Sequence, residues 1–174
     1  MPSRGTFITP IEVCETRYGV LVDQYALDMT EGGAGRFRGS RGLVRDYGVI
    51  GNEAWFTSTF GRHKYLPWGM QGGAPGSCNA IKILFANGRE SEVFGKTARF
   101  HLKKGDVARL ITGSDGGYGD PYDRPVEEVV EDVRNGYVTL EMAKEQYGVI
   151  LDPQTFKVIE LTSGRFIPCH FYKT

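Results

Sequence analysis

The sequence predicts a mainly β protein with a barrel- or sandwich-like body, glycine-rich irregular loops and a small C-terminal helical hairpin. The chain of 174 residues contains 24 glycines, about twice the usual share of roughly 7%. Aromatic residues make up 12% and lie among the glycines, which is typical of tight turns and close backbone approaches in a β-rich body. A helical pattern appears only after residue 121. We therefore place the β body at about residues 1–121.

Short apolar segments separated by turn residues predict the strands of this body. We expect Gly19 to mark a turn within strands that occupy residues 7–27. Gly51-Asn52 and Asn87-Gly88 are pairs of the hairpin type, so each is expected to join two paired strands. The expected strands after residue 27 are 43–50, 53–60, 81–85, 89–93, 97–102 and 107–112, the last two forming a pair linked by residues 103–106.

Three segments are too rich in glycine and proline to form helices or central strands. They cover residues 31–42, 61–79 and 113–121. We expect loops or extended backbone in all three.

The helical hairpin is predicted at about residues 123–148. Four valines recur at helical spacing and mark one face of a helix, namely Val126, Val129, Val130 and Val133. Asp123 is the expected cap of this helix, and Gly136 is expected to end it. Thr139 is the expected N-cap of a second helix, at about 140–147.

Closing strands are expected over about residues 149–174, because apolar segments there flank Asp152-Pro153-Gln154. Internal repeats and a linker that would separate two domains are absent from the sequence. The chain is therefore predicted to form a single domain, residues 1–174.

The charge balance excludes several classes of partner. Lysine and arginine total 21, aspartate and glutamate also total 21, and the net charge is zero. A neutral chain is a poor nucleic-acid binder and lacks the basic excess that holds proteins on anionic membranes. Neutrality favours association with a protein partner.

The cysteine and histidine patterns predict neither disulfides nor a metal site. The three cysteines are Cys14, Cys78 and Cys169, and no CxxC or HExxH spacing is present. Isolated reduced thiols are typical of a cytoplasmic protein. No apolar run has the length of a signal peptide or a membrane span.

An arginine cluster follows the first glycine-rich segment and is the main candidate for a site. Arg36, Arg38 and Arg41 are candidate substrate- or anion-binding residues, because guanidinium groups pair with carboxylates and phosphates. The alternative is that these arginines are neutralised within the protein or by a partner subunit. The internal carboxylates considered for that pairing are Asp28, Glu31 and Asp46.

Asp115 and Asp120 line the third glycine-rich segment and complete the candidate set. Their ordinary roles would be turn residues and helix caps. The Walker pattern is absent, and the glycines at 33–39 are not spaced as in a dinucleotide fold. We therefore expect this chain alone to bind no cofactor, and no catalytic residue is assigned.

Several segments, taken in order, resemble the hydantoinase B/oxoprolinase family. The resemblance runs from about residue 8 to 152 of this chain. The part of the family that it matches is the C-terminal portion of the B subunit. It is carried by Thr9–Val13, Gly32–Gly39 (GGAGRFRG), Gly42–Arg45, Pro67–Gly69, Gly72–Gly76, Lys104–Asp106, Gly113–Pro121 (GSDGGYGDP), Asp132–Thr139 and Tyr147–Val149.

This resemblance implies a subunit of a hetero-oligomer. ATP and Mg²⁺ would be bound by a partner subunit of the hydantoinase A type, and the remainder of the B-type subunit would be a second partner. The first hypothesis is a small subunit of an ATP-dependent carboxylase that acts on a ketone with bicarbonate as co-substrate, organised like acetophenone carboxylase. The second is part of a hydantoinase or oxoprolinase that hydrolyses a cyclic amide. The third is a purely structural assembly subunit.

Overall fold

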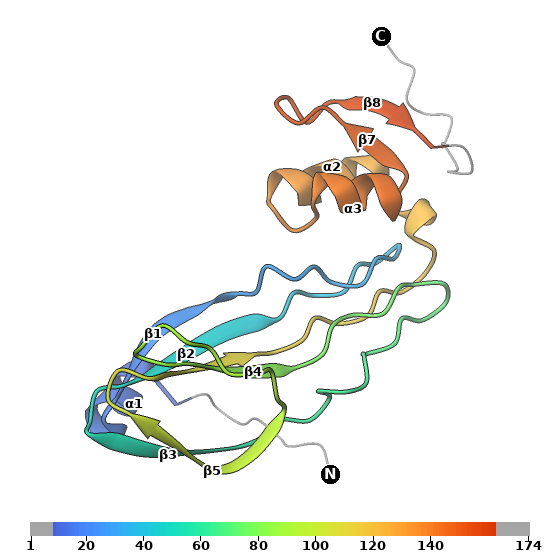
Figure 1. Ribbon diagram of the computed structural model, residues 1–174. Helices are drawn as coiled ribbons and strands as arrows, with labels where there is room; N and C mark the ends of the chain where they lie inside the picture. The colour runs from blue at the N-terminus through green and yellow to red at the C-terminus, as the bar shows by residue number, and fades with distance from the viewer. Residues whose placement is uncertain (1–8, 163–174) are drawn as a thin grey trace. The chain divides into compact units, whose positions relative to one another are not determined.

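The computed structural model describes residues 9–162 (Figure 1). Contacts divide the chain into two compact units that alternate along the sequence. Among the described residues, the sheet unit comprises residues 9–27, Leu43–Lys64 and Asn79–Thr112. The glycine-rich unit comprises Asp28–Gly42, Tyr65–Cys78 and, within the described part of the chain, residues 113–162. The single domain expected from the sequence stays a prediction.

The sheet unit contains two antiparallel sheets. The larger has the order β1-β2-β6-β4, formed by β1 (Val20–Leu27), β2 (Leu43–Val49), β6 (Val107–Ile111) and β4 (Ala80–Leu84). The smaller pairs β3 (Glu53–Thr59) with β5 (Lys96–Lys103). Together with the few helices, these sheets confirm the mainly β prediction.

One apolar cluster is shared by the two sheets of this unit. Ile81, Ile83 and Ala108 come from the larger sheet, and Leu102 comes from the smaller one. Two sheets that bury their apolar faces against each other form a sandwich. Within the described residues neither sheet closes on itself, so the architecture is sandwich-like rather than a closed barrel.

The strands expected at 43–50, 53–60, 81–85, 97–102 and 107–112 are confirmed, but two of the expected hairpins are wrong. Strands β2 and β3 are consecutive yet lie in different sheets, and the same holds for β5 and β6. The connecting turns are therefore corners, and they hydrogen-bond to each other: Lys104 N–H donates to Asn52 O at 3.1 Å, and Gly105 N–H donates to Val49 O at 2.8 Å. The buried Asp106 carboxylate fixes the corner by accepting from the N–H groups of Lys103 and Ala86.

The turn at Asn87-Gly88 is confirmed. Gly88 has a φ of 82°, a conformation that glycine adopts without strain. The chain beyond it returns along β4 through isolated bridges rather than a regular strand, at Leu84–Glu90 and Ile81–Phe94.

A helix, α1 (Ile11–Tyr18), lies where strands were expected. Pro10 occupies its N-cap position, Glu12 lies in its first turn, and Gly19 ends it with a φ of 61°. These are ordinary helix-boundary signals. The helix buries none of its residues, so it has no apolar stripe that would have revealed it by periodicity. Residues 7 and 8 of the expected strands lie outside the described residues.

The helical hairpin is confirmed as α2 (Val126–Arg134) and α3 (Leu140–Glu145). Val129 and Val133 are buried in the core of the glycine-rich unit. Gly136 follows α2 with a φ of 72°, and the Thr139 hydroxyl caps α3 by accepting from Met142 N–H at 3.1 Å.

Two further expectations concern the residues beside these helices. Asp123 does not cap α2, because Pro125 holds that position and Asp123 belongs to the short 3₁₀ turn η1 (Pro121–Asp123). The closing hairpin is confirmed by β7 (Val149–Leu151) and β8 (Val158–Leu161), which pair antiparallel. The remaining expected closing residues, from 163 onward, lie outside the described residues.

Candidate functional site

Three extended segments of the glycine-rich unit run side by side and bond through their backbones (Figure 1). Gly33 N–H donates to Asp115 O at 2.9 Å, Ala74 N–H donates to Ala34 O at 2.7 Å, and Gly117 N–H donates to Ala74 O at 2.9 Å. Each segment therefore provides the hydrogen-bond partners of another. Backbone groups of the glycine segments are thus used to build the unit.

Glycine is required here for space. A Cβ atom at Gly117 would lie 2.5 Å from the carbonyl carbon of Ala34, and one at Gly35 would lie 2.7 Å from the backbone nitrogen of Tyr118. Ordinary Cβ contacts begin at about 3.4 Å. The glycine content noted in the sequence therefore reflects backbone-to-backbone packing between segments that are distant in sequence.

The arginine cluster meets a buried carboxylate on α2. Arg38 Nε lies 2.9 Å from Asp132 Oδ2, and Arg124 Nη2 lies 2.7 Å from the same oxygen. The Arg38 guanidinium also stacks over the Tyr137 ring at 4.5 Å, and Arg124 Nη1 donates to Arg36 O at 2.9 Å. These contacts tie the first glycine-rich segment to the helical hairpin.

The other two candidate arginines lie beside aromatic rings. The Arg36 guanidinium is 5.7 Å from the centroid of Phe37, and the Arg41 guanidinium is 6.0 Å from that of Tyr137. Both arrangements are of the cation–π type. The three candidate arginines thus lie in one unit, and Arg38 and Arg41 share one ring.

Two of the three internal partners considered from the sequence, Asp46 and Glu31, are engaged elsewhere. Asp46 binds Arg109 at 2.7 Å in the sheet unit, and this hydrogen-bonded pair raises the pKa of Arg109. Glu31 accepts from the N–H of Thr139 at 2.6 Å. The carboxylate that neutralises Arg38 is Asp132, which sequence reasoning missed. One sequence signal for Asp132 was available. It lies next to Val133 of the valine stripe, and a carboxylate buried beside such an apolar stripe needs a charged or hydrogen-bonding partner.

The two candidate aspartates have the ordinary local roles. Asp115 Oδ2 accepts from the Ser40 hydroxyl at 2.6 Å, and Asp120 caps the 3₁₀ turn by accepting from Tyr122 N–H at 2.9 Å. Both act as turn or loop residues. Anion binding by these five candidates stays a prediction.

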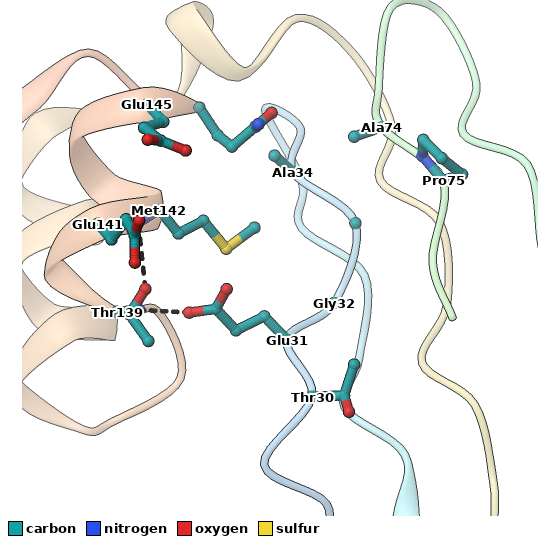
Figure 2. Close-up of a pocket in the computed structure, with 12 residues that line it drawn as sticks. Thr30, Glu31, Gly32, Ala34, Ala74, Pro75, Thr139, Glu141, Met142 and Glu145 are labelled. Atoms are coloured by element: carbon teal, nitrogen blue, oxygen red, sulfur yellow. Dashed lines mark hydrogen bonds between the residues drawn. The ribbon is translucent and has the colours of Figure 1, made fainter. Parts of the chain in front are cut away.

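A pocket of about 360 Å³ lies between the first glycine-rich segment and α3. Figure 2 shows Met142 extending from the helix toward that segment and Glu31 reaching the backbone of Thr139. Glu141 and Glu145 add two exposed carboxylates to its lining. The lining is therefore acidic and would repel an anionic substrate.

Tyr147 is fully buried in the core beside the glycine-rich segments. Burial raises the pKa of its phenol, while a hydrogen bond with the backbone of Gly35 acts in the opposite direction. In residues 9–162 no group of three or more His, Cys, Asp or Glu side chains could hold a metal ion. Nor does the described part of the chain contain a helix long and apolar enough to cross a membrane.

The family is decided by comparison with known sequences. The family model of hydantoinase B/oxoprolinase matches residues 1–121. The chain belongs to the hydantoinase B/oxoprolinase family. Its relatives include the beta subunit of caprolactamase from Pseudomonas jessenii, 33% identical over 82% of this chain and 25% of the relative. Another is the B-type subunit of a putative D-/L-hydantoinase from Pseudomonas sp. strain NS671, 31% identical over 82% of this chain and 24% of the relative.

Solved structures agree with this family. ATP-dependent caprolactamase from Pseudomonas jessenii matches with a TM-score of 0.69 and 29% identity, covering 83% of this chain and 25% of that one. Nucleotide-free acetone carboxylase matches with a TM-score of 0.68 over 88% of this chain and 25% of that one. Its 18% identity shows a shared fold alone. The chain spans about a quarter of the length of these relatives.

Proposed function

We propose that this chain is a B-type module of an ATP-dependent enzyme complex that hydrolyses a cyclic amide. The similarity to caprolactamase carries this proposal: the caprolactamase beta subunit is 33% identical, and the caprolactamase structure combines a TM-score of 0.69 with 29% identity. A relative named as part of a hydantoinase supports the same reaction class.

ATP and Mg²⁺ would be bound by a partner subunit of the hydantoinase A type. ATP would activate the amide carbonyl there, and water would then open the ring. The cytoplasm, where ATP is available, is the expected location.

The chain's own contribution is proposed to be a rigid framework. Arg38 and Arg124 share the buried Asp132, so their charges are neutralised within the unit. The backbone groups of the glycine-rich segments bond to one another. Both features favour assembly over direct contact with the reacting atoms.

Ketone carboxylation, with bicarbonate as co-substrate, is the second candidate. The acetone carboxylase alpha subunit of Xanthobacter autotrophicus is 27% identical over 70% of this chain, and the acetone carboxylase structure has the same fold at a TM-score of 0.68. This was the first expectation from the sequence, and it stays a prediction.

The test uses the complex purified from the protein's own cells and verified by native mass spectrometry. We expect phosphate release from ATP to be stimulated by 5-oxoproline, hydantoin or caprolactam in the absence of bicarbonate. Stimulation only by acetone or acetophenone together with bicarbonate would favour the second candidate. A chain recovered without any ATP-binding partner would contradict both.

The framework role has its own test within that complex. Arg36→Ala removes an exposed guanidinium that has no part in the Asp132 pair. We expect the variant complex to assemble and to keep its turnover within about twofold. Loss of turnover with the complex intact would show that this arginine contacts the substrate.

A further inference from the structure

The glycine-rich unit exposes a set of large apolar side chains that its own core does not use. Four of them lie within six consecutive residues, and two more come from the neighbouring segments. We name them the apolar strip: Phe37 (61% exposed), Tyr65 (83%), Leu66 (51%), Trp68 (74%), Met70 (55%) and Tyr118 (50%).

Backbone bonds hold the strip together with Tyr118 at its centre. On one side Phe37 and Tyr118 exchange two hydrogen bonds, at 3.0 and 2.9 Å, and their ring centroids are 6.3 Å apart. On the other side Met70 forms a parallel bridge to Tyr118. This bridge consists of Met70 N–H to Gly117 O and Gly119 N–H to Met70 O, both 2.9 Å.

Trp68 belongs to the same assembly. A Cβ atom at Gly116 would be 2.7 Å from the Trp68 carbonyl carbon, so the two backbones are in contact. Phe37, Trp68, Met70 and Tyr118 thus come from three segments whose backbones are in contact, and Tyr65 and Leu66 precede Trp68 on one of these segments.

The composition of the strip is that of a protein–protein interface. Isolated exposed apolar residues are ordinary, but a contiguous set marks an interaction surface. Aromatic residues, methionine and arginine are enriched at interfaces, and the Arg36 guanidinium lies 5.7 Å from the Phe37 centroid at its rim. Aromatic side chains held in a fixed position also lose little entropy on binding.

We propose that the apolar strip is the docking surface for the part of the B-type polypeptide that this sequence does not contain. The chain covers 25% of the caprolactamase beta subunit and 25% of the matched caprolactamase chain. In those proteins the other three quarters belong to the same polypeptide as the matched module. In these relatives the matched module is therefore accompanied by the rest of the B-type polypeptide, which is the partner we consider. The inference rests on the assembly part of the proposed function and is independent of the reaction catalysed.

The test measures binding between this chain and that remaining B-type portion, identified by mass spectrometry in the native complex. Phe37→Ser combined with Met70→Ser removes two members of the strip while leaving the backbone bonds in place. Ile159→Ser, on β8 of the same unit, is the matched control, because Ile159 is 64% exposed. We expect the double variant to raise the dissociation constant at least about tenfold and the control to change it less than about twofold.

Folding and alternative occupants are followed in parallel. Circular dichroism and urea unfolding compare the variants. Hydroxyl-radical footprinting of the unmodified complex measures protection of Met70 and Trp68 without any substitution, and at least about threefold protection is expected. The proposal would be overturned if the double variant kept the dissociation constant of the unmodified chain, or if Met70 and Trp68 were not protected in the complex. It would also be overturned if the double variant lost a homodimer but still bound the B-type portion. Binding lost as expected in a complex that hydrolyses no cyclic amide would overturn the proposed reaction only.

Discussion

Replacement of Gly117 by alanine tests the backbone packing of the glycine-rich unit most directly. The new Cβ atom would lie 2.5 Å from the carbonyl carbon of Ala34 and 2.7 Å from the carbonyl oxygen of Gly33. Ordinary contacts begin near 3.4 Å and the carbonyl oxygen of Ala34 would lie closer still, so the two segments would have to separate by more than about 0.9 Å. Gly117 is buried and makes backbone hydrogen bonds to Ala74 and Met70, so the separation would also strain these bonds.

The expected cost is about 2–6 kcal/mol in the free energy of unfolding. Overpacking of this kind costs about 1–3 kcal/mol, and each weakened hydrogen bond adds about 0.5–1.5 kcal/mol. With an m-value of about 2 kcal/mol/M, the urea midpoint is expected to fall by about 1–3 M. Gly61→Ala is the control, because Gly61 is exposed and a Cβ atom there meets nothing within 4 Å. That change is expected to be neutral or stabilising by less than about 1 kcal/mol.

Tryptophan fluorescence separates the two units in this assay. The sequence contains two tryptophans: Trp55 lies on β3 of the sheet unit and Trp68 lies in the glycine-rich unit. In a Trp55→Phe background the signal reports on Trp68 and therefore on the glycine-rich unit. A Gly117→Ala variant that unfolds within about 0.5 kcal/mol of its parent would refute the packing argument.

Three further predictions concern charged and buried groups. Asp132→Asn is expected to lower the free energy of unfolding by about 3 kcal/mol in urea titrations, because two arginines lose their shared, buried carboxylate; Asp123→Asn, at an exposed carboxylate, should change it by less than about 0.5 kcal/mol. Bonds from Thr155 and Gln154 lower the pKa of Asp152 from its ordinary 3.8, so its stabilising effect is present above about pH 4 and lost below. Asp152→Asn should remove that acid dependence from melting temperatures measured between pH 3 and 6. Burial raises the pKa of Tyr147 above 10.0, so the unfolded chain ionises first and stability should fall as the pH rises through about 10. Tyr147→Phe should lack that alkaline loss, and an unchanged pH 9–11 profile would contradict it.

The local structure was largely predictable because its signals lie within a few residues of one another. The valine stripe predicted α2, Thr139 predicted the start of α3, and Gly88 predicted a turn. The helix α1 was missed because it buries no residue. Its signals, Pro10 and Gly19, mark boundaries without an apolar face between them.

The candidate site was predictable only in part. The cluster of Arg36, Arg38 and Arg41 was found because the three residues are close in sequence. Its carboxylate, Asp132, is far along the chain and was not connected to Arg38, since the spacing of residues carries no information about which distant charge will be buried beside them.

By itself the sequence determined where most strands begin and end, which segments exclude helix, and which family the chain resembles. The tertiary structure alone decided that β2 and β3 belong to different sheets, that three glycine-rich segments bond to one another, and that Asp132 neutralises Arg38. Local backbone preferences act over a few residues, so they can be predicted from the residue pattern of a short segment. The choice of partner depends on burial and hydrogen bonding between segments tens of residues apart, which become defined only when the whole chain has folded.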